Sequence, residues 1–88
     1  MNTEEIKKLK EKIKEFESQD VFIKLENAIQ YHTTINNANI IVSDEKLIVS
    51  DEQEQDFIIE LHYLEELEED GNTIYIEMSN DLTITLEY

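Results

Sequence analysis

The sequence predicts an α+β fold in which one N-terminal helix packs on an antiparallel, meander-like sheet of about five to six strands. Two observations support this fold class. Apolar residues recur every three or four positions near the N-terminus, as on one face of a helix, and then alternate with polar residues over much of residues 20–88. The chain has 88 residues, so residues 1–88 are expected to form a single small acidic domain.

The helix is expected over residues 3–18. Asn2 can cap its first turn, with Glu5 three residues further on. The apolar stripe of this helix consists of Ile6, Leu9, Ile13 and Phe16. We consider two roles for the stripe: it packs on the sheet, or it is a seam through which copies of the chain self-associate.

Residues 20–31 fit two patterns. Val21, Ile23 and Leu25 recur at alternate positions as in a strand, whereas Val21, Leu25, Ala28 and Ile29 also fit one helical face. The clustering of Val, Phe and Ile favours a strand over residues 21–26. Residues 33–39 are polar and are expected to form a connection that turns at Asn36-Asn37.

A five-residue motif occurs twice in the middle of the chain. The sequence Ile-Val-Ser-Asp-Glu begins at Ile41 and begins again at Ile48. Ser and Asp side chains bond to their own backbone in turns. The motif therefore predicts two successive strands that end in similar turns.

Residues 53–70 can be written as a helix or as strands. Ser50 would cap the helix and Gly71 would follow its end. However, four acidic residues would then crowd the negative end of the helix dipole. We favour strands, with a two-residue hairpin turn at Asp70-Gly71 and a further hairpin over residues 73–88.

Charge is the most distinctive feature of the chain. It has 22 acidic residues, 7 lysines and no arginine, which gives a net charge of −15. Residues 1–20 carry a net charge of −1, whereas residues 47–88 carry thirteen acids and no lysine. Direct binding to nucleic acid or to an anionic membrane is not expected, because phosphates would be repelled. A basic protein surface is the natural complement.

The acidic residues define the candidate partner-binding face. Carboxylates on a rigid sheet repeat on the scale of nucleic-acid phosphates, so this face could occupy a groove built to hold DNA or RNA. The alternative is a solvated surface without a specific role. The face is expected to comprise Asp51, Glu52, Glu54, Asp56, Glu60, Glu65, Glu66, Glu68, Glu69, Asp70, Glu77 and Asp81.

Catalytic and metal-binding patterns are weak. His32 and His62 are the only histidines, neither belongs to an HExxH motif, and there is no cysteine. The acids from Asp51 to Asp56 do not follow the calcium-loop spacing. We therefore expect no enzyme, no metal site and no cofactor. We also expect a cytoplasmic location, since no apolar run approaches about 20 residues. A bacterial host cell is expected because lysine-only basicity and many Ile and Asn residues suit an AT-rich genome.

In its size, its helix-then-sheet order and its acidic run from Asp51 to Asp70, the chain resembles the small acidic inhibitors that phages encode. These include anti-CRISPR proteins and inhibitors of uracil-DNA glycosylase, which occupy DNA-binding grooves. The resemblance implies a DNA-mimic inhibitor of a nucleic-acid-binding enzyme. The alternatives are an assembly or regulatory module that self-associates through the helix stripe, and a domain that binds a peptide at a sheet edge.

Overall fold

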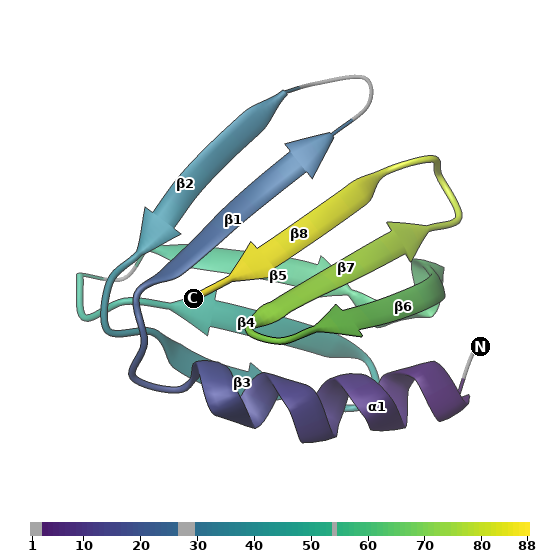
Figure 1. Ribbon diagram of the computed structural model, residues 1–88, viewed down its shortest axis with the longest axis horizontal. Coiled ribbons are helices and arrows are strands. Elements are labelled where there is room, and N and C mark those ends of the chain that lie inside the picture. Colours follow the sequence, from purple (N-terminus) through teal and green to yellow (C-terminus); the bar gives the residue numbers. More distant parts are fainter. Residues whose placement is uncertain (1–2, 27–29, 54) are drawn as a thin grey trace.

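The structure, a computed structural model, describes residues 3–26, 30–53 and 55–88 (Figure 1). Within these ranges no helix is long and apolar enough to cross a bilayer. The elements are α1 (Thr3–Ile13), the 3-10 turn η1 (Lys14–Phe16), β1 (Val21–Glu26), β2 (Tyr31–Ile35), β3 (Asn39–Val42), β4 (Lys46–Ser50), β5 (Asp56–Glu60), the 3-10 turn η2 (Leu61–Tyr63), β6 (Leu64–Asp70), β7 (Thr73–Met78) and β8 (Thr83–Glu87).

The strands form two antiparallel sheets. Five strands follow the order β2-β1-β8-β7-β6, and three follow the order β3-β4-β5. The α+β class and the antiparallel sheet are thus confirmed, and the three-stranded sheet is an addition to the prediction. In the larger sheet, β6, β7 and β8 form a meander, and the β1–β2 hairpin joins it because β1 pairs with β8.

The apolar stripe of α1 lies inside the core. Its four residues are at most 3% exposed, and they pack with buried residues from both sheets. The stripe therefore packs within the chain itself, and none of its four side chains is accessible to a second copy. The α-helix itself ends at Ile13, and one 3-10 turn carries Phe16 into the core.

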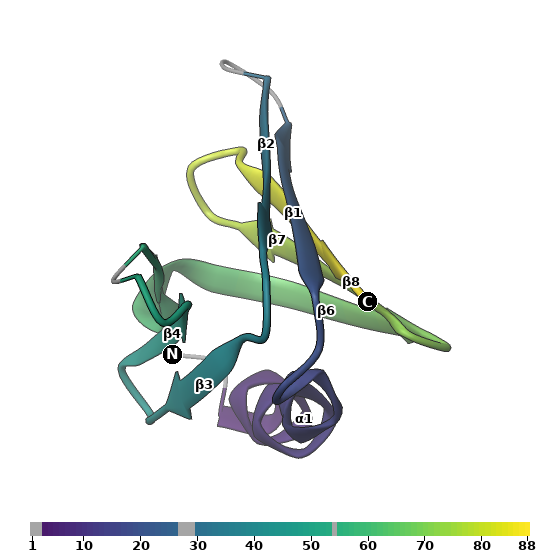
Figure 2. The ribbon, with the colours of Figure 1, turned by 90° about the vertical axis from the view of Figure 1, so that its left-hand side faces the viewer.

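Helix α1 lies between an edge strand of each sheet, as the view along its axis shows (Figure 2). The Glu5 carboxylate accepts a hydrogen bond from the Leu67 backbone N–H of β6, at 2.9 Å. Beyond η1, the Glu17 carboxylate accepts one from the Ile40 backbone N–H of β3, at 2.7 Å. These carboxylates satisfy backbone donors that edge strands otherwise leave unpaired, so α1 connects the two sheets along one side.

The first hairpin partly corrects the sequence prediction. The strand over residues 21–26 is confirmed as β1, but Thr33 to Ile35 belong to β2 and are not part of a connection. The sequence did not predict this strand because its residues are mostly polar and only Ile35 of β2 is buried. The expected turn at Asn36-Asn37 is present, and Asn37 has a positive φ of 51°. Asn2, Ala28 and Ile29 lie outside the described residues.

Residues 56–70 form strands, as we favoured. The pattern breaks at η2, where the chain passes from the three-stranded sheet to the five-stranded sheet. The hairpin turn falls one residue later than predicted, because Asp70 pairs with Thr73 and the two linking residues are Gly71 and Asn72. Gly71 adopts a φ of 61°, which suits glycine at the first position of a primed turn.

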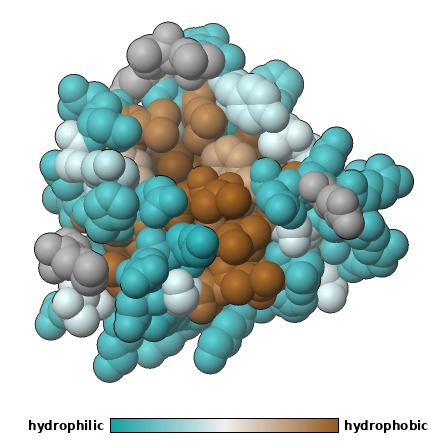
Figure 3. Space-filling model, turned by 180° about the vertical axis from the view of Figure 1, so that it is seen from behind, coloured by the Kyte–Doolittle hydropathy of each residue, from teal (hydrophilic) through white to brown (hydrophobic). Residues whose placement is uncertain are grey.

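The repeated motif forms the β3–β4 hairpin, so its prediction as two strands is confirmed. In the first copy, the Ser43 hydroxyl accepts hydrogen bonds from the backbone N–H groups of Glu45 and Lys46 in the turn. In the second copy, the Asp51 carboxylate accepts hydrogen bonds from the backbone of the next turn. The hairpin pairs the first residue of one copy with the first residue of the other, so Ile41 lies opposite Ile48, and both lie on the outer face of the three-stranded sheet. Figure 3 shows an apolar patch on this side of the molecule, surrounded by hydrophilic side chains.

Candidate functional site

Acidic side chains occupy neighbouring outward positions of β6 and β7. Glu66 lies directly opposite Glu77 in the register, and Glu68 lies opposite Tyr75. Side chains at directly opposite positions have Cβ atoms about 4.5–5.5 Å apart, and like charges there destabilise the sheet. We call this set of outward acids the acidic ridge; it consists of Glu66, Glu68, Asp70 and Glu77.

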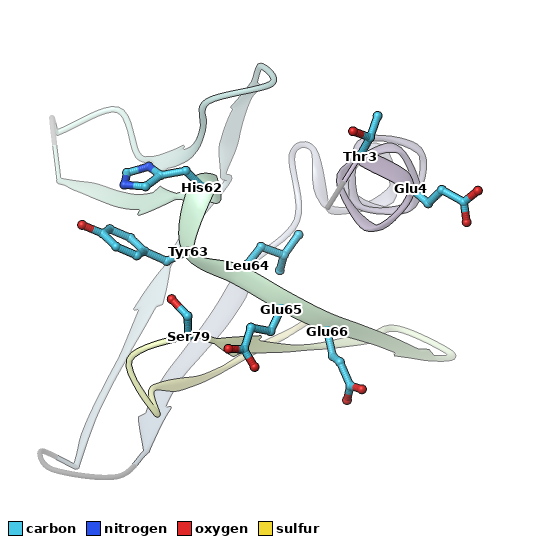
Figure 4. Close-up of a pocket in the computed structure, with 8 residues that line it drawn as sticks. All are labelled: Thr3, Glu4, His62, Tyr63, Leu64, Glu65, Glu66 and Ser79. Carbon is cyan, nitrogen blue, oxygen red and sulfur yellow. The ribbon is translucent and has the colours of Figure 1, made fainter. Parts of the chain in front are cut away.

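A β-bulge raises the density of acids at the start of β6. The register shifts between Leu64 and Glu66, so one additional residue, Glu65, is accommodated. Leu64 and Leu67 are buried, and the two glutamates between them are both exposed. Figure 4 shows Leu64 pointing toward α1, while Glu65 and Glu66 leave β6 on the other side. The bulge thus places Glu65 beside the acidic ridge.

Tyr75 stands among the carboxylates of the acidic ridge and was not among the predicted site residues. It is 40% exposed and contributes to a shallow hollow of about 170 Å³ with Glu66, Glu68, Glu77 and Thr83. The alternation of β7 already placed Tyr75 and Glu77 on the same outward face. What the sequence lacked was the pairing that brings β6 alongside them. An aromatic ring beside carboxylates is suited to the aliphatic stem and charged head of an arginine or lysine.

Lysines pair with acids elsewhere in the molecule. Lys12 pairs with Glu15 at 3.2 Å on the helix, and Lys24 pairs with Glu26 at 3.5 Å on β1. In the part of the chain that the structure describes, no lysine forms an ion pair with a carboxylate of the acidic ridge. The described residues therefore provide no lysine ion pair that would neutralise the charge of the ridge.

The other predicted acids are not part of this cluster. Asp51 accepts hydrogen bonds from the backbone of Gln53 and Gln55, both at 2.9 Å, so it shapes the β4–β5 turn. Glu52 accepts a hydrogen bond from the Asn37 side chain at 3.2 Å. Asp56 and Glu60 lie on β5, in the three-stranded sheet. The sequence grouped these residues with the ridge because it could not show that the chain changes sheets.

Three further acids lie at the margins. Glu69 also belongs to β6, but its position is on the opposite face of the strand from the acidic ridge. It is exposed near the end of the strand. Asp81 lies in the β7–β8 turn with a φ of 64°. Glu54 lies outside the described residues. Of the twelve predicted acids, β6 and β7 therefore gather Glu65, Glu66, Glu68, Glu69, Asp70 and Glu77.

His62 lies in η2 at a wide, open hollow of about 770 Å³ between the start of α1, η2 and β6 (Figure 4). Its ring packs against Tyr63, with 3.9 Å between ring centroids, and its Nδ1 is 3.8 Å from a Glu60 carboxylate oxygen. Its side chain is about half exposed. Among the described residues, no three His, Asp or Glu side chains are grouped so that they could hold a metal ion.

Comparison of the chain with protein-family models, with curated proteins and with solved structures found no match.

Proposed function

We propose that this chain is a non-enzymatic inhibitor that presents the acidic ridge to the basic, nucleic-acid-binding groove of a host enzyme. The observation that carries the proposal is the register of β6 and β7, which holds Glu66 opposite Glu77; across residues 3–26, 30–53 and 55–88 no lysine forms an ion pair with either. A like-charge pair at this position opposes sheet stability. A cationic partner would remove that repulsion on binding.

The ridge is preorganised because its residues lie on paired strands of a five-stranded sheet. Along a strand, side chains on one face are about 6.5–7 Å apart, and adjacent strands are about 4.8 Å apart. A partner that binds phosphates through Lys and Arg would meet fixed charges at a similar spacing. Little conformational freedom would be lost on the inhibitor's side, which favours affinity.

The finer assignment is an anti-defence inhibitor of the anti-CRISPR type, encoded by a phage and acting in the cytoplasm of a bacterial host. The size, acidity and helix-then-sheet order of the chain support this part of the proposal. Self-association through the helix stripe is the weaker alternative, because Ile6, Leu9, Ile13 and Phe16 are buried in the chain itself.

The proposal is tested by affinity capture from nuclease-treated bacterial lysate, with captured proteins identified by mass spectrometry. The ridge variant carries Glu66→Gln, Glu68→Gln and Glu77→Gln. The control variant carries Glu52→Gln, Asp56→Asn and Glu60→Gln, which change the net charge equally but lie away from β6 and β7. We expect the control to retain a nucleic-acid enzyme that the ridge variant loses, and the captured enzyme to elute as salt rises.

Three results would contradict the proposal. Equal loss of the partner in both variants would show that net charge, and not the ridge, attracts it. Retention of the partner by the ridge variant would show that another face binds. If a captured enzyme still processed its nucleic acid in the presence of saturating inhibitor, the chain would not occupy the nucleic-acid-binding groove.

A further inference from the structure

Three isoleucines form a continuous row across the outer face of the three-stranded sheet. Ile41 on β3 lies opposite Ile48 on β4, and Ile48 lies opposite Ile58 on β5. Ile41 is 53% exposed and Ile58 is 52% exposed, while Ile48 between them is partly buried. We call these three residues the isoleucine row. Contiguous apolar surface rimmed by polar residues is typical of interaction sites.

The isoleucine row does not belong to the core. The inward positions of the same strands, such as Leu47 and Val49, are the ones that pack in the core, and they are fully buried. In an antiparallel sheet with one solvated face, the outward positions are normally polar. Figure 3 shows the apolar patch on this side of the molecule and the hydrophilic side chains around it. The row is therefore an apolar surface that the described part of the chain leaves exposed.

Acidic residues stand at both ends of the strands that carry the row, namely Asp44, Glu45, Asp51, Glu52 and Asp56. The first two lie in the β3–β4 turn, and the other three lie at the β4–β5 end of the sheet. Asp56 is on the outer face itself, since it pairs with Ser50 two residues from Ile48. Asp44 forms an ion pair with Lys10, whereas in the described ranges the other four carboxylates form none.

Basic residues only partly offset these acids. Among the outward positions of β3, β4 and β5, Lys46 is the one lysine, and it lies opposite Glu60 in the register. The rim of the isoleucine row is therefore net acidic, with the larger excess at the β4–β5 end. Such a rim repels a second copy of this chain and an anionic membrane. It attracts a partner whose apolar surface is flanked by cations.

The dimensions of the face match those of one α-helix. Ile41 and Ile58 lie two strand spacings apart, which is about 9.6 Å. Helix positions i, i+4 and i+7 share one face and span about 10.5 Å along the axis. A helix is about 10–12 Å wide and five-residue strands are about 17 Å long, so one helix along the row fits between the acidic turns. The face is far smaller than the roughly 800 Å² that each folded partner usually buries.

We propose that the isoleucine row binds a cationic amphipathic helix of a protein partner. The helix lies along the row and across the strands, so that its apolar residues at i, i+4 and i+7 contact Ile41, Ile48 and Ile58. Lys and Arg residues on its two flanks then face the β3–β4 turn and the β4–β5 turn. An amphipathic helix that lays its apolar face on an apolar surface is a common mode of peptide recognition. The site is on the other sheet from the acidic ridge and does not depend on the proposed function.

Titration of the isotope-labelled full chain with a synthetic peptide, followed by amide shifts in two-dimensional NMR spectra, tests the proposal. The peptide has about 15 residues so that it can form a helix, with Leu at i, i+4 and i+7 and Lys on both flanks. A second peptide has the same composition, but its leucines are spread around the helix. Both are attracted equally by the net charge of −15. We expect the first peptide to shift amides of β3, β4 and β5, and the second to bind at least about tenfold more weakly.

The apolar contact is tested with a variant that carries Ile41→Thr and Ile58→Thr, which keep β-branched side chains in the strands. The matched control is Phe22→Thr, which removes an apolar side chain of 37% exposure from the other sheet. We expect the isoleucine variant to bind the first peptide at least about tenfold more weakly, because two apolar contacts are lost. The control should bind as the wild type does, and well-dispersed spectra establish that both variants are folded.

The acidic rim is tested with Glu52→Gln and Asp56→Asn together, which should weaken binding of the first peptide and reduce its salt dependence. Glu66→Gln and Glu77→Gln together remove the same charge from the acidic ridge and should leave the affinity nearly unchanged. Equal binding of the two peptides, unchanged binding by the isoleucine variant, or equal loss in the two charge variants would each overturn the proposal. None of these results tests the ridge as an inhibitory surface, because that test measures capture of a nucleic-acid enzyme.

Discussion

The two sheets share one core but present very different outer faces. At one edge of the five-stranded sheet's outer face, Glu66 of β6 lies opposite Glu77 of β7; at the centre of the three-stranded sheet's outer face, Ile48 of β4 lies opposite Ile58 of β5. Most inward positions of both sheets are apolar and belong to, or pack against, the shared core. The inward positions therefore determine the fold. The outward positions differ from the usual mixed polar surface of an antiparallel sheet: those of β6 and β7 concentrate like charges, and those of the three-stranded sheet expose apolar side chains. Such departures are expected at binding surfaces.

The largest predicted effect tests whether the two faces belong to one cooperative unit. Leu9 is fully buried in the core that both sheets share. Leu9→Ala should lower the free energy of unfolding by about 2–5 kcal/mol, because it removes buried methyl groups and leaves a cavity. Amide hydrogen exchange should show matching losses of protection in β4 and β7, and Lys7→Ala, an exposed change on the same helix, should have little effect. Loss confined to one sheet would mean that the sheets unfold separately.

The next effect concerns the edge of the five-stranded sheet alone. Glu5→Ala removes the acceptor of the partly buried Leu67 N–H. We expect a loss of about 1–3 kcal/mol, since an unsatisfied buried donor costs this much. Glu4→Ala, at the exposed neighbouring position, is the control. Hydrogen exchange of the Leu67 amide should accelerate more than that of β4 amides. Equal exchange in both variants would show that another acceptor replaces Glu5.

A pair of charge reversals compares the outer faces directly. Glu77→Lys replaces a repulsive pair with Glu66 by an attractive one, whereas Lys46→Glu places a like charge opposite Glu60. We expect Glu77→Lys to stabilise the protein and Lys46→Glu to destabilise it, each by about 0.2–1 kcal/mol. Urea unfolding should show both effects shrinking at high salt. If Glu77→Lys destabilised the protein, the acidic ridge would not be a site of strain.

The smallest effect lies where η1 meets Tyr88. Partial burial raises the pKa of Tyr88 above its usual value of 10.0, and the hydrogen bond that its hydroxyl donates to Glu15 raises the pKa further. The folded state thus holds the phenolic proton more tightly than the unfolded state does. This contribution to stability is complete below pH 10 and is lost as the pH rises through the folded pKa. Thermal melts should show a steeper alkaline decline for the wild type than for Tyr88→Phe; equal declines would contradict the pKa shift.

Local pattern predicted much of the fold. The stripe of α1, the strand over residues 21–26 and the strands within residues 53–70 follow from the spacing of apolar residues, because each spacing matches one backbone period. The strand β2 was missed because its Tyr-His-Thr-Thr-Ile sequence buries only one residue fully. Its place depends on pairing with β1, a contact that a local window does not contain.

The candidate site could be predicted only in part. The sequence showed that residues 47–88 carry thirteen acids and no lysine. It could not separate Asp51, which shapes a turn, from Glu66, which stands on the outer face of a sheet. The bulge that exposes Glu65 beside Glu66 also has no local signature in the sequence, because it arises from the register with β7.

The sequence by itself determined the charge, the periodicity of α1 and of most strands, and the apolar inward residues that the core requires. The tertiary structure alone decided which strands became neighbours, and hence that Glu66 meets Glu77 and that Ile41, Ile48 and Ile58 form a row. The physical reason is that a strand fixes only the alternation of its own side chains. Which side chains lie next to them across a sheet depends on pairing and register between segments distant in sequence.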